Sequence, residues 1–168
     1  RYSRSMSVVR VIGIDPGIGT TGFGILDGKG GKTRLHSYGT IKPPAKDSIE
    51  LRLKYLYSEV QKLIHEYKPS IMAIEDSFYS KNVKSALTLG QARGALILAA
   101  VNADINVRQY APRKVKQSVV GNGAASKEQV QFMVTQILKL KEAPESLDIS
   151  DAIAIALTYY NQAKFEDL

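Results

Sequence analysis

The sequence has no cysteine, no long apolar run and only two histidines among its 168 residues. The lack of cysteine excludes disulfides, zinc sites built on thiolates and catalysis by a thiol nucleophile. No apolar stretch is long enough to span a bilayer or to form the centre of a secretory signal. We therefore expect a cytoplasmic protein without a membrane partner. His36 and His65 fall in a predicted strand and a predicted helix, and neither is given a functional role.

Acidic residues are outnumbered by basic ones. The chain has 23 Lys and Arg against 16 Asp and Glu, a formal net charge of +7. Such a charge favours polyanions, nucleic acid foremost, although many proteins of this charge bind none. With 44% hydrophobic residues the chain can bury one core, but it is too short for two domains. We expect one domain over residues 8–162, after an N-terminal extension or cloning remnant (1–7) and before a tail (163–168).

The order of the predicted elements indicates a fold class. Three β-rich segments joined by turns come first, and β-α-β alternation follows. The predicted strands are Val8–Ile14, Gly22–Leu26, Arg34–Ile41, Ile71–Glu75 and Ile105–Gln109. The predicted helices are 49–68, Ala86–Asn102, Pro112–Val120, Lys127–Leu140 and Asp148–Gln162. This order predicts an α/β fold with flanking helices, whose mixed sheet has three antiparallel strands followed by parallel ones.

Four carboxylates stand at the ends of these elements. Asp15 ends the first β-branched run, and Glu75 ends the strand after the first helix. Asp148 and Asp151 open the last helix, where their i, i+3 spacing puts both side chains on one face. Acids that converge in a folded protein repel one another and resist ionisation unless a cation compensates them. Because no Arg or Lys motif matches these acids, we expect them to bind a hard divalent cation, Mg²⁺.

Each acid also has a simpler explanation. Asp15 before Pro16-Gly17 can initiate a turn, because Asp side chains bond to nearby backbone amides. Capping and the helix dipole explain one acid at the start of the last helix, but explain two less well. Glu75 is harder to dismiss, since a turn after a strand more often uses Gly, Asn or Asp. Asp151 precedes a segment that is apolar nearly all round, so it should lie against the core and need a partner.

The Gly-rich turn after Asp15 could also handle phosphate. It lacks the lysine of a P-loop and is followed by a strand rather than a helix, which excludes a P-loop NTPase. It resembles the first phosphate motif of actin-like and sugar-kinase ATPases, but those proteins need two such domains. A single-domain nuclease of the ribonuclease H-like architecture explains the motif better. An actin-like nucleotide-binding domain and a non-catalytic DNA-binding module are the alternatives.

Five segments carry a more specific resemblance. They are Ile12–Gly17, Ala73–Glu75, Ser85–Gly94, Val115–Gly121 and Asp148–Ala152. In this order and at these spacings they resemble the RuvC family of Holliday junction resolvases over about residues 8–160. The resemblance implies an RNase H-like fold, a homodimer and Mg²⁺-dependent paired nicking of four-way DNA junctions in recombination and repair. It also implies as partners the junction-binding and branch-migration helicase proteins of the resolvasome.

The resemblance implies a set of catalytic acids, matched position by position. Asp15, Glu75, Asp148 and Asp151 would be the catalytic residues and the metal ligands. The family carries Asp or His at or beside the place of Asp151, so the ligand set is least defined there. Two Mg²⁺ ions per site, for which Mn²⁺ can substitute, would activate water and stabilise the leaving oxygen. We assign Asp15 as the shared ligand, Glu75 to the water-activating ion, and Asp151 with Asp148 to the leaving-group side.

Several basic residues are expected to contact DNA. The resemblance puts basic active-site residues at Lys116 and Lys127, where the alternative is a solvated lysine on a helix. Phe78 follows Glu75 in a loop predicted over Ser77–Lys84 and would stack on unpaired bases at the crossover. Packing of Phe78 under the loop is the alternative. Additional phosphate contacts are expected from Lys81 and Lys84, and the basic track could extend to Arg93, Arg108, Arg113 and Lys114.

The predicted helix Ala86–Asn102 is a candidate for the dimer contact. It is rich in Ala and Leu, and Gly90 and Gly94 lie four residues apart, a spacing that permits close approach of another helix. A two-fold junction requires two symmetric active sites, which is the arrangement that a C₂ dimer provides. We therefore expect this helix to face its copy in a second chain.

Overall fold

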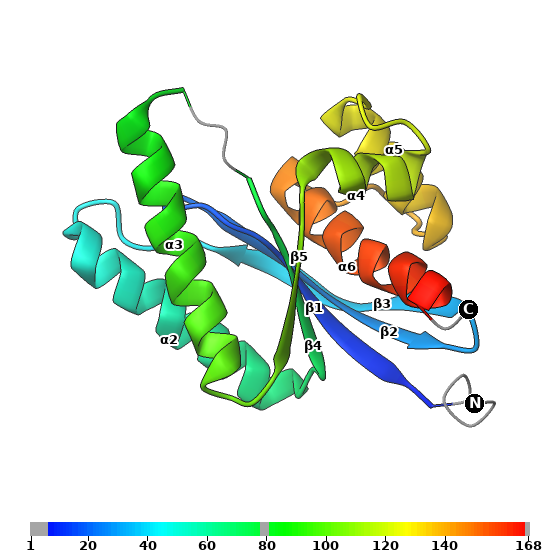
Figure 1. The fold of residues 1–168 in the computed structure, drawn as a ribbon, viewed down its shortest axis with the longest axis horizontal. Helices are drawn as coiled ribbons and strands as arrows, with labels where there is room; N and C mark the ends of the chain where they lie inside the picture. Colours follow the sequence, from blue (N-terminus) through cyan, green and yellow to red (C-terminus); the bar gives the residue numbers. More distant parts are fainter. Residues whose placement is uncertain (1–6, 78–80, 167–168) are drawn as a thin grey trace.

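A five-stranded mixed sheet forms the centre of the protein, with helices on both faces (Figure 1). The computed structural model describes residues 7–77 and 81–166. The strands, in chain order, are β1 Val9–Asp15, β2 Thr21–Lys29, β3 Lys32–Ile41, β4 Ile71–Glu75 and β5 Asn106–Tyr110. Their order in the sheet is β3-β2-β1-β4-β5, antiparallel from β3 to β1 and parallel from β1 to β5. The predicted mixed α/β sheet is confirmed.

Helices cover both faces of this sheet. One face carries α2 (Ile49–Tyr67) and α3 (Val83–Val101). The opposite face carries α4 (Pro112–Val120), α5 (Lys127–Ile137) and α6 (Leu147–Glu166), on the right in Figure 1. None of the described helices combines the length and apolar character that crossing a bilayer requires.

The central strand β1 is buried on both faces, which explains its unbroken apolar run. Ile12 and Ile14 belong to the core under α2 and α3. Val11 points the other way, into the core under α6. The strand therefore delivers Asp15, its last residue, to the edge of a fully packed sheet.

Glycines allow α6 to lie very close to β1 and β2. The glycine strip under this helix consists of Gly13, Gly22, Gly24 and Gly28. A Cβ on Gly13 would lie 2.1 Å from the carbonyl oxygen of Ala152, and one on Gly22 would lie 2.3 Å from that of Asp148. Gly22 is also the residue opposite Asp15 in the β1–β2 register. Because these glycines have no side chains, α6 lies close to the sheet, and its first turn lies beside Asp15.

The start of α3 differs from the prediction because of a cap. The helix begins at Val83 rather than Ala86, since the Asn82 side chain accepts a hydrogen bond from the Ser85 amide. Lys84 is therefore helical and does not belong to a loop. The N-cap of α2 is Ser48, whose side chain accepts a hydrogen bond from the Leu51 amide.

Two other helices have different ends from those predicted. α5 stops at Ile137 instead of Leu140, and Lys139 just beyond it has φ 52°, in the left-handed region. The start of α5 is closed by a capping box that Ser126 and Gln129 form. α6 covers Leu147–Glu166 rather than Asp148–Gln162.

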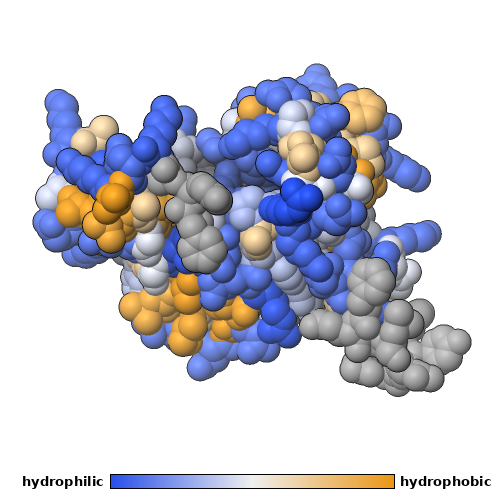
Figure 2. All heavy atoms as spheres, turned by 45° about the horizontal axis from the view of Figure 1, so that its top comes forward, coloured by the Kyte–Doolittle hydropathy of each residue, from blue (hydrophilic) through white to orange (hydrophobic). Residues whose placement is uncertain are grey.

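Helix α3 carries an apolar surface that the described part of the chain leaves uncovered. It packs on α2 through Ala92, Leu96, Ala99 and Ala100. Its opposite side, here called the α3 stripe, repeats every three or four residues and consists of Val83, Leu87, Gly90, Gly94, Leu98 and Val101. A Cβ on either stripe glycine would meet no atom within 4 Å. Figure 2 shows apolar side chains gathered on the side of the molecule that carries α2 and α3. The stripe glycines thus bring no helix close within the described chain.

Candidate active site

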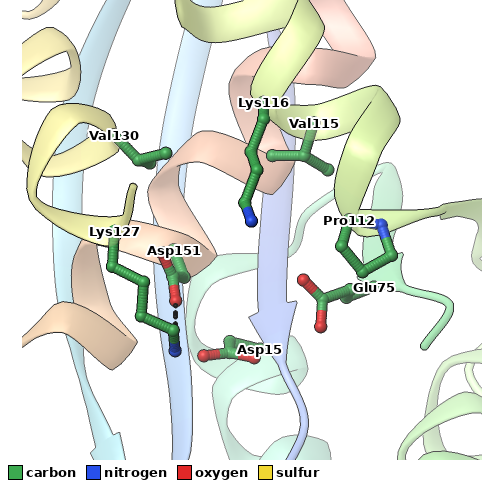
Figure 3. Close-up of a pocket in the computed structure, with 8 residues that line it drawn as sticks. All are labelled: Asp15, Glu75, Pro112, Val115, Lys116, Lys127, Val130 and Asp151. Atoms are coloured by element: carbon green, nitrogen blue, oxygen red, sulfur yellow. Dashed lines mark hydrogen bonds and ion pairs between the residues drawn. The ribbon is translucent and has the colours of Figure 1, made fainter. Parts of the chain in front are cut away.

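Three of the four predicted acids line one pocket at the edge of the sheet. β1 and β4 are parallel neighbours, with Ile14 opposite Ile74, so Asp15 and Glu75 emerge side by side. Asp151 reaches the same place from the second turn of α6. Figure 3 shows these carboxylates around one space. The pocket measures about 150 Å³ and is lined by Asp15, Glu75, Pro112, Val115, Lys116, Lys127, Val130 and Asp151.

Asp148 lies at the rim of this site. It stands one turn before Asp151 on α6, is half-buried and is not among the pocket-lining residues. Its charge nevertheless acts on Asp15. The glycine strip accounts for this proximity, because Gly22 lies under the backbone of Asp148 and opposite Asp15.

The carboxylates of the site lie close together and are partly buried, and both facts change their pKa values. Burial, together with the charges of Glu75, Asp151 and Asp148, raises the pKa of Asp15 from 3.8 to about 8, and burial is the largest of these causes. Burial is also the main reason that the pKa of Glu75 is raised, with Asp151 adding to it. The pKa of Asp151 is raised by burial despite the nearby Lys127. Such a group of acids is ready to exchange protons for a cation.

A lysine partly neutralises the negative charge of these acids. The sequence argument that no Arg or Lys motif accompanies them was therefore wrong. The ammonium Nζ of Lys127 lies 3.2 Å from Oδ2 of Asp151 and donates a hydrogen bond to it. Burial lowers the pKa of Lys127, but Asp151 and the other acids outweigh this effect, so the pKa is raised. Lys116 enters the pocket from α4, and its charge lowers the pKa of Glu75. Asp151 thus has the partner that its burial demanded.

The donor set of the pocket suits a hard divalent cation. Within residues 7–77 and 81–166, no three acidic or histidine side chains already converge as a formed metal site would. Besides the two lysines, the polar groups that face the pocket are carboxylates from three different elements, and burial and their mutual repulsion raise their pKa values. Oxygen ligands of this kind are what Mg²⁺ prefers. Asp15, Glu75 and Asp151 could hold such an ion, with Asp148 near enough to assist.

The residues predicted to contact DNA lie at two places in the structure. Lys116 and Lys127 line the pocket, whereas Lys81 and Lys84 are exposed near the start of α3. Phe78 lies outside the described residues.

Arg93 does not belong to an exposed basic track. Its side chain is only 15% exposed, and its Nε donates a hydrogen bond to the carbonyl oxygen of Glu75 over 2.9 Å. Sequence reasoning missed this role because a backbone acceptor leaves no trace in the residue pattern. Apolar pocket residues such as Val115 and Val130 were also missed, although their helical spacing marks them as buried.

Comparison with known proteins covers nearly the whole chain. The family model "Crossover junction endodeoxyribonuclease RuvC" matches residues 11–159. A protein of that name from Syntrophomonas wolfei is 45% identical over 151 residues, which cover 90% of this chain and 88% of the relative. Another protein of that name, from Finegoldia magna, is 44% identical over 160 residues, which cover 95% of this chain and 98% of the relative.

A solved structure matches equally broadly. RuvC of Thermus thermophilus in complex with a Holliday junction substrate superposes with a TM-score of 0.88 at 37% identity. The match covers 94% of this chain and 96% of that one. It confirms the expected RNase H-like fold with its mixed sheet and flanking helices. The chain belongs to the RuvC family of crossover junction endodeoxyribonucleases, and is accordingly a nuclease.

Proposed function

We propose that this chain resolves four-way DNA junctions in the cytoplasm by paired symmetric nicks that depend on Mg²⁺, in homologous recombination and DNA repair. The observation that carries the proposal is the convergence of Asp15, Glu75 and Asp151 from β1, β4 and α6 on one pocket. The Thermus thermophilus relative supports the choice of DNA, since it was solved with a Holliday junction substrate. The basic net charge of +7 agrees with such a ligand.

The four acids would divide the work of holding the metal. Two ions per site, Mg²⁺ or in its place Mn²⁺, would supply an activated water and neutralise charge on the phosphate and the leaving oxygen. Asp15 suits the shared position, because the charges of the three other acids all raise its pKa. Glu75 would serve the water side, and Asp151 with Asp148 the leaving-group side.

Basic and aromatic residues would hold the DNA around this pocket. Lys116 and Lys127 line it, so a phosphate that enters would meet both ammonium groups. Lys127 would then contact phosphate as well as Asp151. The exposed Lys81 and Lys84 would bind phosphates farther along, and Phe78 would stack on unpaired bases at the crossover.

A second copy of the chain would cover the α3 stripe. Leu87, Leu98 and Val101 are 66%, 51% and 53% exposed, a large cost for apolar side chains that stay in water. A C₂ dimer through this face would bury them and provide the two symmetric sites that paired nicking requires. The junction-binding and branch-migration helicase proteins of recombination would be further partners of the dimer on its DNA.

A direct test uses a synthetic four-way junction with labelled strands. We expect the protein to produce paired nicks in the presence of Mg²⁺ and to bind without cutting in EDTA. An ATP-hydrolysis assay runs beside it, because turnover of ATP without DNA cleavage would favour the actin-like alternative. Binding without cleavage at any divalent ion would favour a non-catalytic DNA-binding module.

A further inference from the structure

Arg93 connects helix α3 to the peptide group that follows Glu75. Its Nε donates to the Glu75 carbonyl oxygen at 2.9 Å. One terminal nitrogen, Nη2, lies 3.4 Å from Oδ1 of Asp76 and donates to the side-chain oxygen of Gln109 on β5. A single guanidinium therefore holds the ends of β4 and β5 against α3. Lysine could not make these contacts together, because it lacks the planar fork of donors.

The peptide between Glu75 and Asp76 is fixed from both sides. Arg93 binds its carbonyl oxygen, and its N–H donates to the carbonyl oxygen of Tyr110 over 2.8 Å. The orientation of this peptide plane determines the backbone angle ψ of Glu75. With ψ fixed, the direction in which the Glu75 side chain leaves the strand is fixed as well. β4 ends at Glu75, so the bond to Tyr110 is the last backbone bond between β4 and β5, and Arg93 adds a side-chain contact at the carbonyl of the same peptide.

The setting of Arg93 argues against a role as a DNA contact. Only 15% of its side chain is exposed, and its hydrogen bonds run to groups of its own chain. Lys81 and Lys84, by comparison, are exposed and free to meet phosphate. The guanidinium charge also lies close enough to lower the pKa of the Glu75 carboxyl, against the effect of burial.

We propose that Arg93 is a positioning residue, which sets the direction of the Glu75 carboxylate through the peptide bond behind it. The inference rests on the proposed function of Glu75 in metal-dependent cleavage. Residues that orient a metal-binding side chain typically change metal affinity or activity by about 10–100-fold when they are replaced. Loss of Arg93 should therefore slow the chemical step while junction binding stays unchanged.

The test separates binding from cleavage in the Arg93→Ala protein. We expect its single-turnover cleavage rate at saturating junction and Mg²⁺ to fall by about 10–100-fold, with the junction Kd within about twofold of wild type. A loss confined to Kd would make Arg93 a DNA contact and overturn the proposal. An unchanged cleavage rate would overturn it too. If the wild-type protein itself fails to cleave, the proposed function is at fault rather than this inference.

Arg10→Ala is the matched control. Arg10 also makes a forked ion pair, with Nε 2.7 Å and Nη2 2.9 Å from the Asp27 carboxylate. It lies on β1 five residues before Asp15, about 17 Å from the pocket at the usual rise per residue. Its replacement removes the same charge and a structural ion pair, so we expect a lower Tm with the cleavage rate per folded molecule unchanged. An equal rate loss in both variants would show that Arg93 acts only through stability.

Chemical rescue adds a readout that a merely structural role would not move. Millimolar guanidinium should fill the space left in Arg93→Ala and restore part of the cleavage rate, but it should not restore Glu75→Gln. Should Arg93→Ala fail to fold, Arg93→Lys replaces it in the binding and cleavage assays. Lysine keeps the charge without the fork, so slow cleavage with normal junction affinity is expected, and wild-type cleavage would overturn the proposal.

Discussion

Replacing Gly22 with alanine should damage the active site without touching any carboxylate. The added Cβ would lie 2.3 Å from the Asp148 carbonyl oxygen, while ordinary van der Waals contact begins near 3.4 Å. The first turn of α6 must therefore move outward by about 1 Å, because the backbone oxygen cannot rotate away like a side chain. This turn carries Asp148 and leads into Asp151, so both acids would shift relative to Asp15.

A displacement of about 1 Å in catalytic geometry can cost about 10²-fold in rate. Overpacking of this kind also destabilises by about 1–3 kcal/mol. We expect Gly22→Ala to remain folded, with a Tm lower by several degrees and single-turnover junction cleavage slower by about 10²-fold. Thermal unfolding and cleavage at saturating Mg²⁺ measure the two effects on the same sample.

Gly19→Ala is the control for this prediction. Gly19 lies in the turn between β1 and β2 and is exposed, and within the described chain a Cβ on it would meet no atom within 4 Å beyond its two chain neighbours. Its replacement should leave both Tm and rate close to wild type. If Gly22→Ala cleaves at the wild-type rate, the height of α6 does not govern the position of the acids, and the reasoning is wrong.

Four further outcomes are expected. Asp15→Asn, Glu75→Gln and Asp151→Asn should each abolish cleavage while leaving junction binding in a gel-shift assay largely intact; full cleavage by any of them removes that residue from the mechanism. Because the pKa of Asp15 is raised from 3.8 to about 8, the folded state holds a proton that the unfolded state has lost. In EDTA, the free energy of unfolding should therefore decrease by on the order of a few kcal/mol as pH rises from about 4 to 8, and Tm should fall with it. Asp15→Asn should reduce this decrease, and a Tm that rises over the range contradicts the shift. The logarithm of the junction association constant should fall with the logarithm of salt concentration, with a slope of about −0.9 per phosphate contacted. Lys84→Ala should make this slope smaller and Asp15→Asn should leave it unaltered. A nearly flat dependence would exclude phosphate-driven binding. Gly94→Leu fits the open space beside α3, so we expect folded monomers in sedimentation and single nicks at most; an unchanged dimer would show that the α3 stripe is not the interface.

Much of the site could be predicted from the sequence because strand ends are strong positional signals. An apolar run that stops at Asp15 and another that stops at Glu75 identify the same edge of a sheet once both strands are parallel. The apolar surroundings of Asp151 in sequence indicated burial, and hence a partner. That partner, Lys127, could not be identified, because the approach of α5 to α6 depends on how two helices pack, which no local pattern encodes.

Glycines show the opposite case, in which residue type was informative but location was not. The spacing of Gly90 and Gly94 predicted a close approach, and in the described chain both lie at an open surface. The close approach is found at Gly13 and Gly22 instead, beneath α6. A glycine indicates that something requires the absence of a side chain, but a neighbour from more than a hundred residues away leaves no local mark. The end of α5 was also not predictable from the local pattern, because the apolar residues continue to Leu140 although the helix ends at Ile137.

Helix α6 follows every other described element in the chain, which has a consequence for synthesis and folding. The helix supplies Asp148 and Asp151, and the hydroxyl of Tyr160 donates to the carbonyl oxygens of Val9, 151 residues earlier, and Leu26. Contacts so distant in sequence form late, because the long loop between them must close first. A nascent chain that ends before α6 would expose one face of its sheet and lack two of the acids. The ability to cut DNA would thus arise only when α6 docks, so that a nascent chain without this helix would be inactive.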